Sequence, residues 1–396
     1  MVQHNGRVVQ CENGPTIRTT RTVNEDKAAR YHRLRRRATL LDTAVVALLL
    51  LLLLVTGASA ALRDWASVAT GRSPSLTVTI YLVLIALLIE AVRLPVAFYR
   101  GVVLERRYEL STEVPGRWWW DRAKALVVGL PLAVLVGLVV WSLVWWTPAY
   151  WWLVAGLCFA LMLVLVAHAA PVLFMPLFDR CEPVQRSELA RRLVALAERV
   201  GARVLGVFEW RVSGRTRTAN AVLVGLGRTR RILLSDTLLA GHSDDEIEVI
   251  LAHELAHHVH HDIWTAMALE SSLVLVGFFL AHHALGAVVG QFGVEATSDV
   301  AGLPVVLLAS GAVTVGFLPV AHALSRAHER RADRYALDIT GHAEAFTSAM
   351  KRLAAQNLAE ERPSRLVELL FLSHPPVASR LDAVRTWESR KRAPAR

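Results

Sequence analysis

The sequence predicts a mostly α-helical fold: a polytopic integral membrane protein of about six transmembrane helices, with an α+β domain on one face of the membrane that contains a small β-sheet. Three observations predict this class. Of the 396 residues, 54% are hydrophobic and 20% charged, and the mean hydropathy is +0.38. The apolar residues form blocks of about 20, the length at which a helix crosses a bilayer. Two long polar segments interrupt and follow these blocks, so we expect them to fold outside the membrane.

The apolar blocks define six candidate spans, at residues 43–62, 76–97, 125–146, 150–173, 263–290 and 300–324. The first follows a long basic segment and is longer than the core of a signal peptide, so we expect it to be retained. The spans divide the chain into a basic cytoplasmic tail, partly disordered (1–38), an N-terminal membrane domain of four helices (39–175), a polar segment (176–262), two further membrane helices (263–324), a second polar segment (325–389) and a tail (390–396).

Basic residues predict which side of the membrane each segment occupies, because they gather in cytoplasmic segments. Arginines crowd residues 30–37 and 100–122, so we place the N-terminal tail and the loop after the second span inside. An even number of crossings then puts both polar segments on the same cytoplasmic face. The composition, rich in Arg and Ala, fits a bacterial inner (plasma) membrane, and the endoplasmic reticulum remains an alternative.

Tryptophans gather around the Thr147-Pro148 turn, which should lie outside. They are Trp141, Trp145, Trp146, Trp151 and Trp152. We expect an interfacial belt with apolar rings and hydrated N–H groups; a stacking platform for a ligand is the alternative.

The formal charge of +10 does not predict a nucleic-acid partner. In a membrane protein basic residues also lie beside lipid head groups, and the chain has no nucleic-acid motif. Membrane lipids are therefore the expected partners of its basic surface. The three cysteines are scattered and predict neither a disulfide framework nor a thiolate zinc site.

The first polar segment reads as an amphipathic helix at 187–200 followed by short strands at 204–212, 219–226 and 232–235. Ser243 and Asp244 then provide a helix N-cap, with Glu246 as capping-box partner. The second polar segment reads as helical, with breaks at Pro363 and at Pro375-Pro376.

The helix that begins at this cap contains the motif His-Glu-Leu-Ala-His. His253 and His257 are four residues apart, so both imidazoles project from one face and can bind one zinc ion. Glu254 can reach a water molecule on that ion rather than the ion itself. Such strings also occur by chance, but the apolar residues just before this one place the helix in a core. Asp262 is a candidate to hydrogen-bond one of the imidazoles.

A catalytic zinc ion has three protein ligands and one open position, so a third ligand should come from another segment on the same face. Segment 325–333 directly follows the sixth span, and Glu329 and Asp333 share a helix face there. We expect Glu329 to be the ligand and Asp333 to orient a histidine. The alternative is a solvated helix in which Glu329 pairs with Arg326 and Arg330.

Three motifs in this order resemble those of the M48 metallopeptidases, specifically the Ste24 or CAAX prenyl protease branch. They are HELAH at 253–257, SRAHERRAD at 325–333 and SHPPVASRL at 373–381. Segments 103–111, 170–183 and 219–232 resemble the same family, so that the resemblance covers residues 93–385.

The resemblance implies a zincin-like catalytic domain with one Zn²⁺ per chain. His253, His257 and Glu329 would be the zinc ligands, Glu254 the general base and Asp333 a residue that supports the ligands. The resemblance also assigns roles to Asn220 with Ala221, which would bind the substrate backbone, and to His374, which would stabilise the oxyanion with support from Arg380.

Two departures from the family pattern affect what the resemblance implies. Eukaryotic members have seven spans around a large chamber, whereas six are counted here. Thr218-Ala219 also precede Asn220 where the prenyl proteases carry His-Ser, so a preference for prenylated substrates does not transfer.

The expected function is hydrolysis of peptide bonds in membrane-associated or lipidated proteins and peptides by a membrane-embedded zinc endopeptidase. A non-catalytic membrane scaffold with a vestigial zinc site is the alternative, and the intact Glu254 argues against it. A transporter is less favoured, because ionisable residues within the spans are few.

Overall fold

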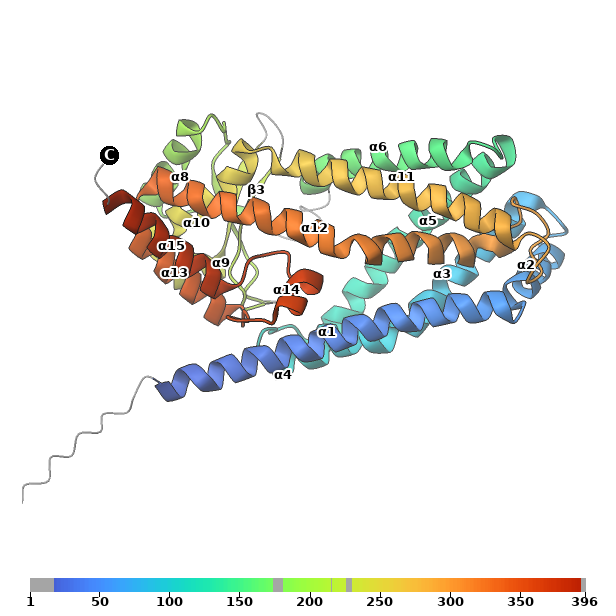
Figure 1. Cartoon of the computed structure of the whole chain (residues 1–396), viewed down its shortest axis with the longest axis horizontal. Coiled ribbons are helices and arrows are strands. Elements are labelled where there is room, and N and C mark those ends of the chain that lie inside the picture. The colour runs from blue at the N-terminus through green and yellow to red at the C-terminus, as the bar shows by residue number, and fades with distance from the viewer. Residues whose placement is uncertain (1–17, 174–180, 215, 226–229, 393–396) are drawn as a thin grey trace, which may run out of the picture.

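The computed structural model describes residues 18–173, 181–214, 216–225 and 230–392. A bundle of long helices continues at one end into a smaller α+β region (Figure 1). The long helices are α1 (Arg18–Val55), α3 (Pro74–Phe98), α5 (Pro115–Trp146), α6 (Trp151–Leu173), α11 (Asp262–Val288) and α12 (Leu303–Thr340). Shorter elements join them, namely α2 (Ala58–Ala69), the π-helix η1 (Tyr99–Leu104), α4 (Glu105–Arg107) and the 3₁₀ helix η3 (Val300–Gly302).

Five helical segments of the described chain are long and apolar enough to cross a membrane: Lys27–Val55, Pro74–Arg107, Pro115–Trp146, Asp262–Val288 and Val300–Thr340. The remaining predicted span, 150–173, corresponds to α6, which is apolar over Trp151–Val166. The chain is thus a mostly helical integral membrane protein, as the sequence predicts. The first span ends earlier than predicted, because Gly57 adopts a left-handed conformation (φ 72°) that separates α1 from α2.

The N-terminal segment differs from the expected partly disordered tail. Helix α1 begins at Arg18 and runs without a break into the membrane span. Its buried residues Ala28 and Tyr31 pack against Leu104, Tyr108 and other residues that follow α3, so tertiary contacts stabilise a helix that composition alone does not predict. The expected tail at 390–396 is likewise helical as far as Arg392, where α15 ends. Residues 1–17 and 393–396 lie outside the described residues.

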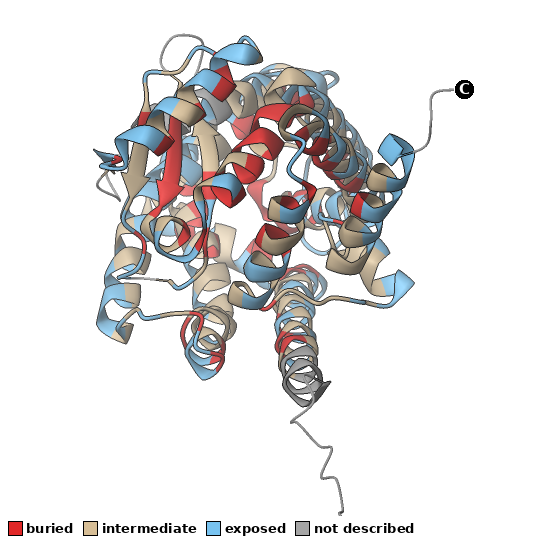
Figure 2. Cartoon of the chain, turned by 90° about the vertical axis from the view of Figure 1, so that its left-hand side faces the viewer, coloured by how far each residue is buried: buried red, intermediate tan, exposed pale blue. Residues whose placement is uncertain are grey.

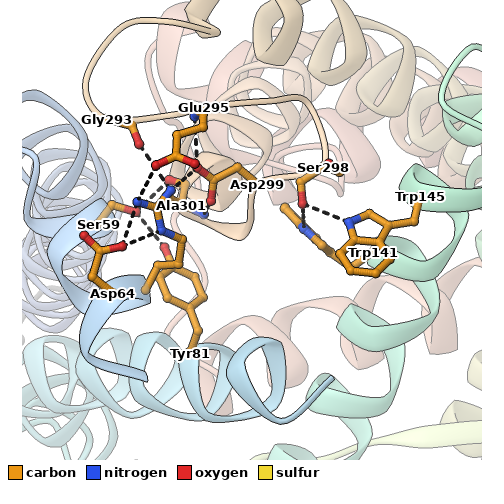
Figure 3. Close-up of polar contacts among 11 residues, drawn as sticks. Ser59, Asp64, Tyr81, Trp141, Trp145, Gly293, Glu295, Ser298, Asp299 and Ala301 are labelled. Atoms are coloured by element: carbon orange, nitrogen blue, oxygen red, sulfur yellow. Dashed lines mark hydrogen bonds and ion pairs between the residues drawn. The ribbon is translucent and has the colours of Figure 1, made fainter. Parts of the chain in front are cut away.

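The membrane end remote from the α+β region is closed by polar contacts (Figure 3). Arg63 of α2 pairs with Asp64 and Asp299, and the Ser59 hydroxyl donates to the Ala301 carbonyl (2.6 Å). The connection between α11 and α12 is thereby fixed to α2.

Three of the tryptophans expected to present hydrated N–H groups bond within the protein instead. Trp141 and Trp145 donate to the Ser298 carbonyl at 2.8 and 3.3 Å, and Trp151 donates to His282 Nδ1 at 2.9 Å. The connection between α11 and α12 supplies the acceptor for the first two (Figure 3), and a pattern along one helix could not reveal it.

The α+β region contains a four-stranded sheet in the order β1-β2-β4-β3. Its strands are β1 (Cys181–Pro183), β2 (Val207–Trp210), β3 (Ala221–Val224) and β4 (Arg231–Ser235). β2 and β4 are parallel, whereas the β1–β2 and β3–β4 pairs are antiparallel. The three predicted strands are present but shorter than predicted. β1 was not predicted, because a strand of three residues is too short to show an alternation of apolar and polar side chains. β3 forms one edge of the sheet.

Six helices complete the α+β region: α8 (Ser187–Arg199), α9 (Asp236–Gly241), α10 (Asp244–Val259), α13 (Ala343–Gln356), α14 (Arg365–Phe371) and α15 (Val377–Arg392). α8 matches the predicted amphipathic helix, with Leu189, Leu193 and Leu196 buried. Buried residues from both polar segments form one core (Figure 2). Both segments therefore fold together at one end of the bundle, as the parity of the crossings predicts.

Candidate metal centre

Helix α10 places the His-Glu-Leu-Ala-His motif in the core of the α+β region. Its first turn is fixed by the predicted capping box: Glu246 N donates to Ser243 Oγ (3.3 Å) and Ser243 N donates to Glu246 Oε2 (2.8 Å). Leu251 and Leu255 on the same helix are fully buried. The backbone that carries the two histidines is therefore held at its start and along its apolar face.

Helix α12 supplies the carboxylate. It crosses the membrane region and continues without interruption into the α+β region, where it packs against α10 (Figure 1). Glu329 and Asp333 both lie on its buried face, with exposures of 6% and 2%. The predicted alternative, a solvated helix, is wrong.

Three potential ligand groups meet between α10 and α12. His253 Nε2 lies 3.2 Å from Glu329 Oε2, and His257 Nε2 lies 3.5 Å from Glu329 Oε1. One ligand atom from each of the three residues lies within 4.8 Å of the others. The arrangement thus brings together the three residues that the sequence predicted to bind one ion.

The donor set and its spacing fit a metal ion. Two atoms bound tetrahedrally at about 2.0–2.1 Å from zinc lie about 3.3 Å apart, close to the two separations observed. Glu329 Oε2 is also buried; ring nitrogens of His253 and His374 lie 3.2 and 2.9 Å from it, but neither makes a hydrogen bond of suitable geometry. A buried carboxylate oxygen that faces ring nitrogens without a well-aligned hydrogen bond is suited to bind a cation together with them.

The histidines are held from behind by carboxylates. Nδ1 of His253 lies 2.9 Å from Asp333 Oδ1, and Asp333 in turn accepts a hydrogen bond from Arg380 Nε at 2.8 Å. Asp333 thus takes the orienting position predicted for it, and Arg380 is linked to His253 through the Asp333 carboxylate.

A second chain of contacts holds the other histidine. Nδ1 of His257 lies 2.9 Å from Asp262 Oδ2, and Arg331 donates to Asp262 Oδ1. Asp262 was a candidate from the sequence, but Arg331 was not singled out. Arg331 lies two residues from Glu329, on another face of α12. Its contact with Asp262 forms only because α11 packs against α12.

Burial and the neighbouring charges shift the pKa values of this cluster. Burial lowers the pKa of His253, but its contacts with Asp333 and Glu329 outweigh this and raise the pKa to about 9. Contacts with Glu329 and Asp262 outweigh burial in the same way and raise the pKa of His257. A metal ion competes with these protons, because a coordinating imidazole must be neutral.

Glu254 is in a different position from the other acidic residues of the cluster. It is next to His253 in the chain, and burial raises the pKa of its carboxyl group while the neighbouring histidines oppose that shift. A carboxylate with a raised pKa is a stronger proton acceptor. The environment of Glu254 is therefore suited to proton transfer.

His374 follows α14 and reaches the cluster from the second polar segment. Its Nδ1 lies 2.9 Å from Glu329 Oε2, and its side chain is 65% exposed. The His-Pro-Pro turn thus presents one ring nitrogen to the ligand carboxylate and the rest of the ring to the open side of the site.

Asn220 and Ala221 lie at the start of the edge strand β3, which packs against α10. Asn220 is fixed by its backbone, since its N–H donates to Ser235 Oγ (2.9 Å) and its carbonyl accepts from Ser235 N (3.0 Å). Its side chain is exposed. The strand that follows Asn220 therefore lies against the helix that carries His253 and His257.

Comparison with known sequences identifies the family. Residues 183–388 match the model of peptidase family M48, and residues 19–180 match that of the CAAX prenyl protease N-terminal region, described as five membrane helices. The chain belongs to peptidase family M48. In the matched N-terminal range, the described residues contain the four long helices α1, α3, α5 and α6 and the short elements α2, η1 and α4.

The chain is similar to proteins from bacteria and eukaryotes. It is 28% identical over 332 residues to an uncharacterized metalloprotease of Bacillus subtilis, covering 83% of this chain and 78% of that protein. It is 26% identical over 324 residues to CAAX prenyl protease 1 of Saccharomyces cerevisiae, covering 77% and 71%. The crystal structure of Saccharomyces mikatae Ste24p matches with a TM-score of 0.79 at 23% identity, covering 91% of this chain and 88% of that one. This M48 member is therefore a membrane metalloprotease whose family implies a bound metal.

Proposed function

We propose that this M48 member is a zinc-dependent endopeptidase that hydrolyses peptide bonds of membrane-associated or lipidated proteins. The observation that carries the proposal is the meeting of His253, His257 and Glu329, with Glu254 beside them. Two imidazoles and one carboxylate are the donor set of a catalytic zinc site, with a fourth position left for water or substrate.

Each residue of the cluster has a separate task in this proposal. His253, His257 and Glu329 would hold a zinc ion, which would supply a water of lowered pKa and a Lewis acid for the substrate carbonyl. Glu254 accepts the proton of the attacking water and passes it to the leaving amine. His374 donates a hydrogen bond to the developing oxyanion from its exposed ring.

The substrate is proposed to pair with the outer edge of β3. This edge has no partner strand in the described part of the chain, and β3 begins at Ala221, directly after Asn220. Main-chain pairing at a strand edge holds an extended peptide and tolerates varied side chains. Such binding suits an endopeptidase that acts on several substrates.

The proposed orientation places the centre at the cytoplasmic face of a bacterial inner membrane. The basic segments 30–37 and 100–122 lie toward the same end of the bundle as the centre (Figure 1), and basic residues mark cytoplasmic loops. Substrates would then reach the site from the cytoplasm or from the inner leaflet.

A matched pair of glutamate substitutions on α10 tests the catalytic proposal. We expect Glu254→Gln to retain one zinc ion per chain and to lose at least about a hundredfold in kcat on membrane and prenylated peptides. Glu248→Gln is the control, because Glu248 lies on the same helix and pairs with Arg192 away from the centre. Undiminished cleavage by Glu254→Gln would refute the role of Glu254, and zinc binding without any cleavage by the wild type would favour a non-catalytic scaffold.

A further inference from the structure

The segment that leads to His374 has little apolar packing to hold it in place. It includes α14, and none of the residues Arg365–Phe371, all of which the structure describes, is buried. Leu366 and Leu369 on this helix are 67% and 43% exposed. Although α14 lies against α12, the burial of apolar side chains therefore contributes little to its position. Polar contacts are left to fix the segment.

Arg326 of α12 makes such a contact on the N-terminal side of His374. Its Nη1 donates to the carbonyl oxygens of Glu368 and Leu372 at 2.7 and 2.6 Å, and its Nε lies 3.6 Å from the Glu368 carboxylate. The last carbonyls of a helix have no partner within that helix, and basic side chains can bind them. Here the cation comes from another helix, so it fastens the end of α14 to α12.

The burial of Arg326 distinguishes it from its neighbours on α12. Its side chain is 8% exposed, whereas Arg330, one turn later, is exposed. A buried cation is costly unless its donors are hydrogen-bonded, and the two carbonyls meet that need. The alternative from the sequence paired Arg326 with Glu329, but the contacts that Arg326 makes in the described residues are with Glu368 and Leu372.

Arg326 lies on the same face of α12 as the candidate metal ligand. Glu329 follows it by three residues and Asp333 by seven, spacings that place side chains along one side of a helix. All three side chains are buried. One face of α12 thus carries the contact to α14, the ligand carboxylate and the carboxylate that supports His253.

The chain between Arg326 and the metal cluster is short. His374 is two residues after Leu372, so their Cα atoms are at most about 7 Å apart, and Pro375 restricts the backbone of His374 before it. The His374 side chain is 65% exposed, yet its Nδ1 lies 2.9 Å from Glu329 Oε2. Because little surrounds the ring, its position depends on where the backbone is held.

Arg380 makes the matching contact on the C-terminal side of His374. It belongs to α15, and its Nε donates to Asp333 Oδ2 at 2.8 Å. Val384 of the same helix is buried in the core of the α+β region. His374 therefore lies between two arginine contacts, and each of them ties its segment to the face of α12 that carries Glu329.

We propose that Arg326 is a positioning residue for His374. By holding the Leu372 carbonyl against α12, it keeps the His374 ring beside the Glu329 carboxylate, where the oxyanion needs a donor. This inference rests on the proposed peptidase function. Arg326 is not one of the three candidate ligands, so its loss should affect the transition state through His374 and should leave zinc binding largely unchanged.

Single and double variants of the full-length protein test this role by kinetics on a quenched membrane peptide. We expect Arg326→Met to lower kcat about 10–100-fold, with KM changed less than about twofold, because a displaced oxyanion donor is largely lost. Arg326→Lys keeps three donors on a cation and should recover part of kcat. In the His374→Ala protein, Arg326→Met should lower kcat by less than about a further twofold, because both changes remove one interaction.

Hydrogen exchange measured by mass spectrometry gives a second readout, which does not depend on turnover. Amides of residues 365–374 should exchange faster in Arg326→Met, because the end of α14 is released, whereas those of α10 should not change. The control is Arg330→Met, which makes the same change at an exposed position of α12 and should leave kcat and exchange unaltered. One zinc ion per chain shows that a variant is folded, and Arg326→Lys replaces Arg326→Met if the latter binds none.

Wild-type kcat in Arg326→Met would overturn the proposal, and so would equal losses of kcat with and without the His374 ring. If His374→Ala lowered kcat but Arg326→Met did not, only the role of Arg326 would fail. If the wild type showed no zinc-dependent cleavage, the proposed function would fail instead. The exchange of residues 365–374 would still decide whether Arg326 holds the segment, and unchanged exchange in Arg326→Met would show that it does not.

Discussion

At the scale of single residues, each histidine of the centre has its own supporting pair. Asp333 and Arg380 lie behind His253, and Asp262 and Arg331 lie behind His257. Such partners fix the tautomer and orientation of an imidazole and make it a better ligand. The two supporting carboxylates come from different helices: Asp262 is the first residue of α11, whereas Asp333 belongs to α12.

This difference leads to a prediction for Asp262. We expect Asp262→Asn to weaken zinc binding about 10–100-fold, since His257 loses a charged partner, and to recover most of its kcat when zinc is saturating. Competition with a fluorescent chelator measures the affinity. Asp382→Asn is a matched control on an exposed pair with Arg385. Unchanged zinc affinity in Asp262→Asn would show that His257 needs no support from this carboxylate.

The residues of the metal cluster differ in how far the sequence alone could predict them. His253 and His257 follow from spacing on one helix, since four residues make about one turn. Predicting Glu329 as a ligand required the number of membrane crossings and the family resemblance. From its local sequence alone, a glutamate between two arginines could equally be a solvent-exposed residue in ion pairs. Arg331 could not be predicted, since its contact with Asp262 exists only once α11 and α12 are packed together.

At the scale of elements, the boundaries of the helices depend on contacts that no local pattern contains. The capping box at Ser243 was predicted because its residue types and spacing are local. The start of α1 was not, because Tyr31 is buried against residues some seventy positions later in the chain. β1 was missed for the same reason: its pairing with β2 comes from the sheet.

The N-cap at Ser243 should contribute to the stability of α10. Ser243→Ala removes the acceptor for Glu246 N, so we expect a loss of about 1 kcal/mol of stability, as for other N-caps. The measurement is the free energy of unfolding of the purified protein in detergent. Ser389→Ala, near the end of α15, is the control and should have little effect. A Ser243→Ala protein as stable as the wild type would mean that α10 is held by core packing alone.

At the scale of the whole molecule, the metal centre joins segments on either side of the last two membrane helices. His253 and His257 precede α11, whereas Glu329 and His374 follow the membrane part of α12. A ligand that binds only the folded state stabilises it in proportion to the logarithm of its concentration over Kd.

We therefore expect metal removal to destabilise the protein. Dialysis against a chelator should lower Tm, and added Zn²⁺ should restore it, whereas Mg²⁺ should not because it prefers all-oxygen octahedral sites. A 100-fold excess of zinc over Kd corresponds to about 2.7 kcal/mol. The Glu329→Gln protein should lose most of the zinc response, and a full response in that variant would place the metal elsewhere.

The course of α12 gives the centre a mechanical property. The helix is continuous from Leu303, next to the contacts that Arg63 makes with Asp299, to Thr340 beyond the cluster. Pro319 lies inside this helix and removes one of its backbone hydrogen bonds, so the part that carries Glu329 can bend relative to the part before Pro319. A change in bilayer thickness that tilts the membrane part of α12 would then move the Glu329 carboxylate relative to the two imidazoles only as far as the helix fails to bend at Pro319.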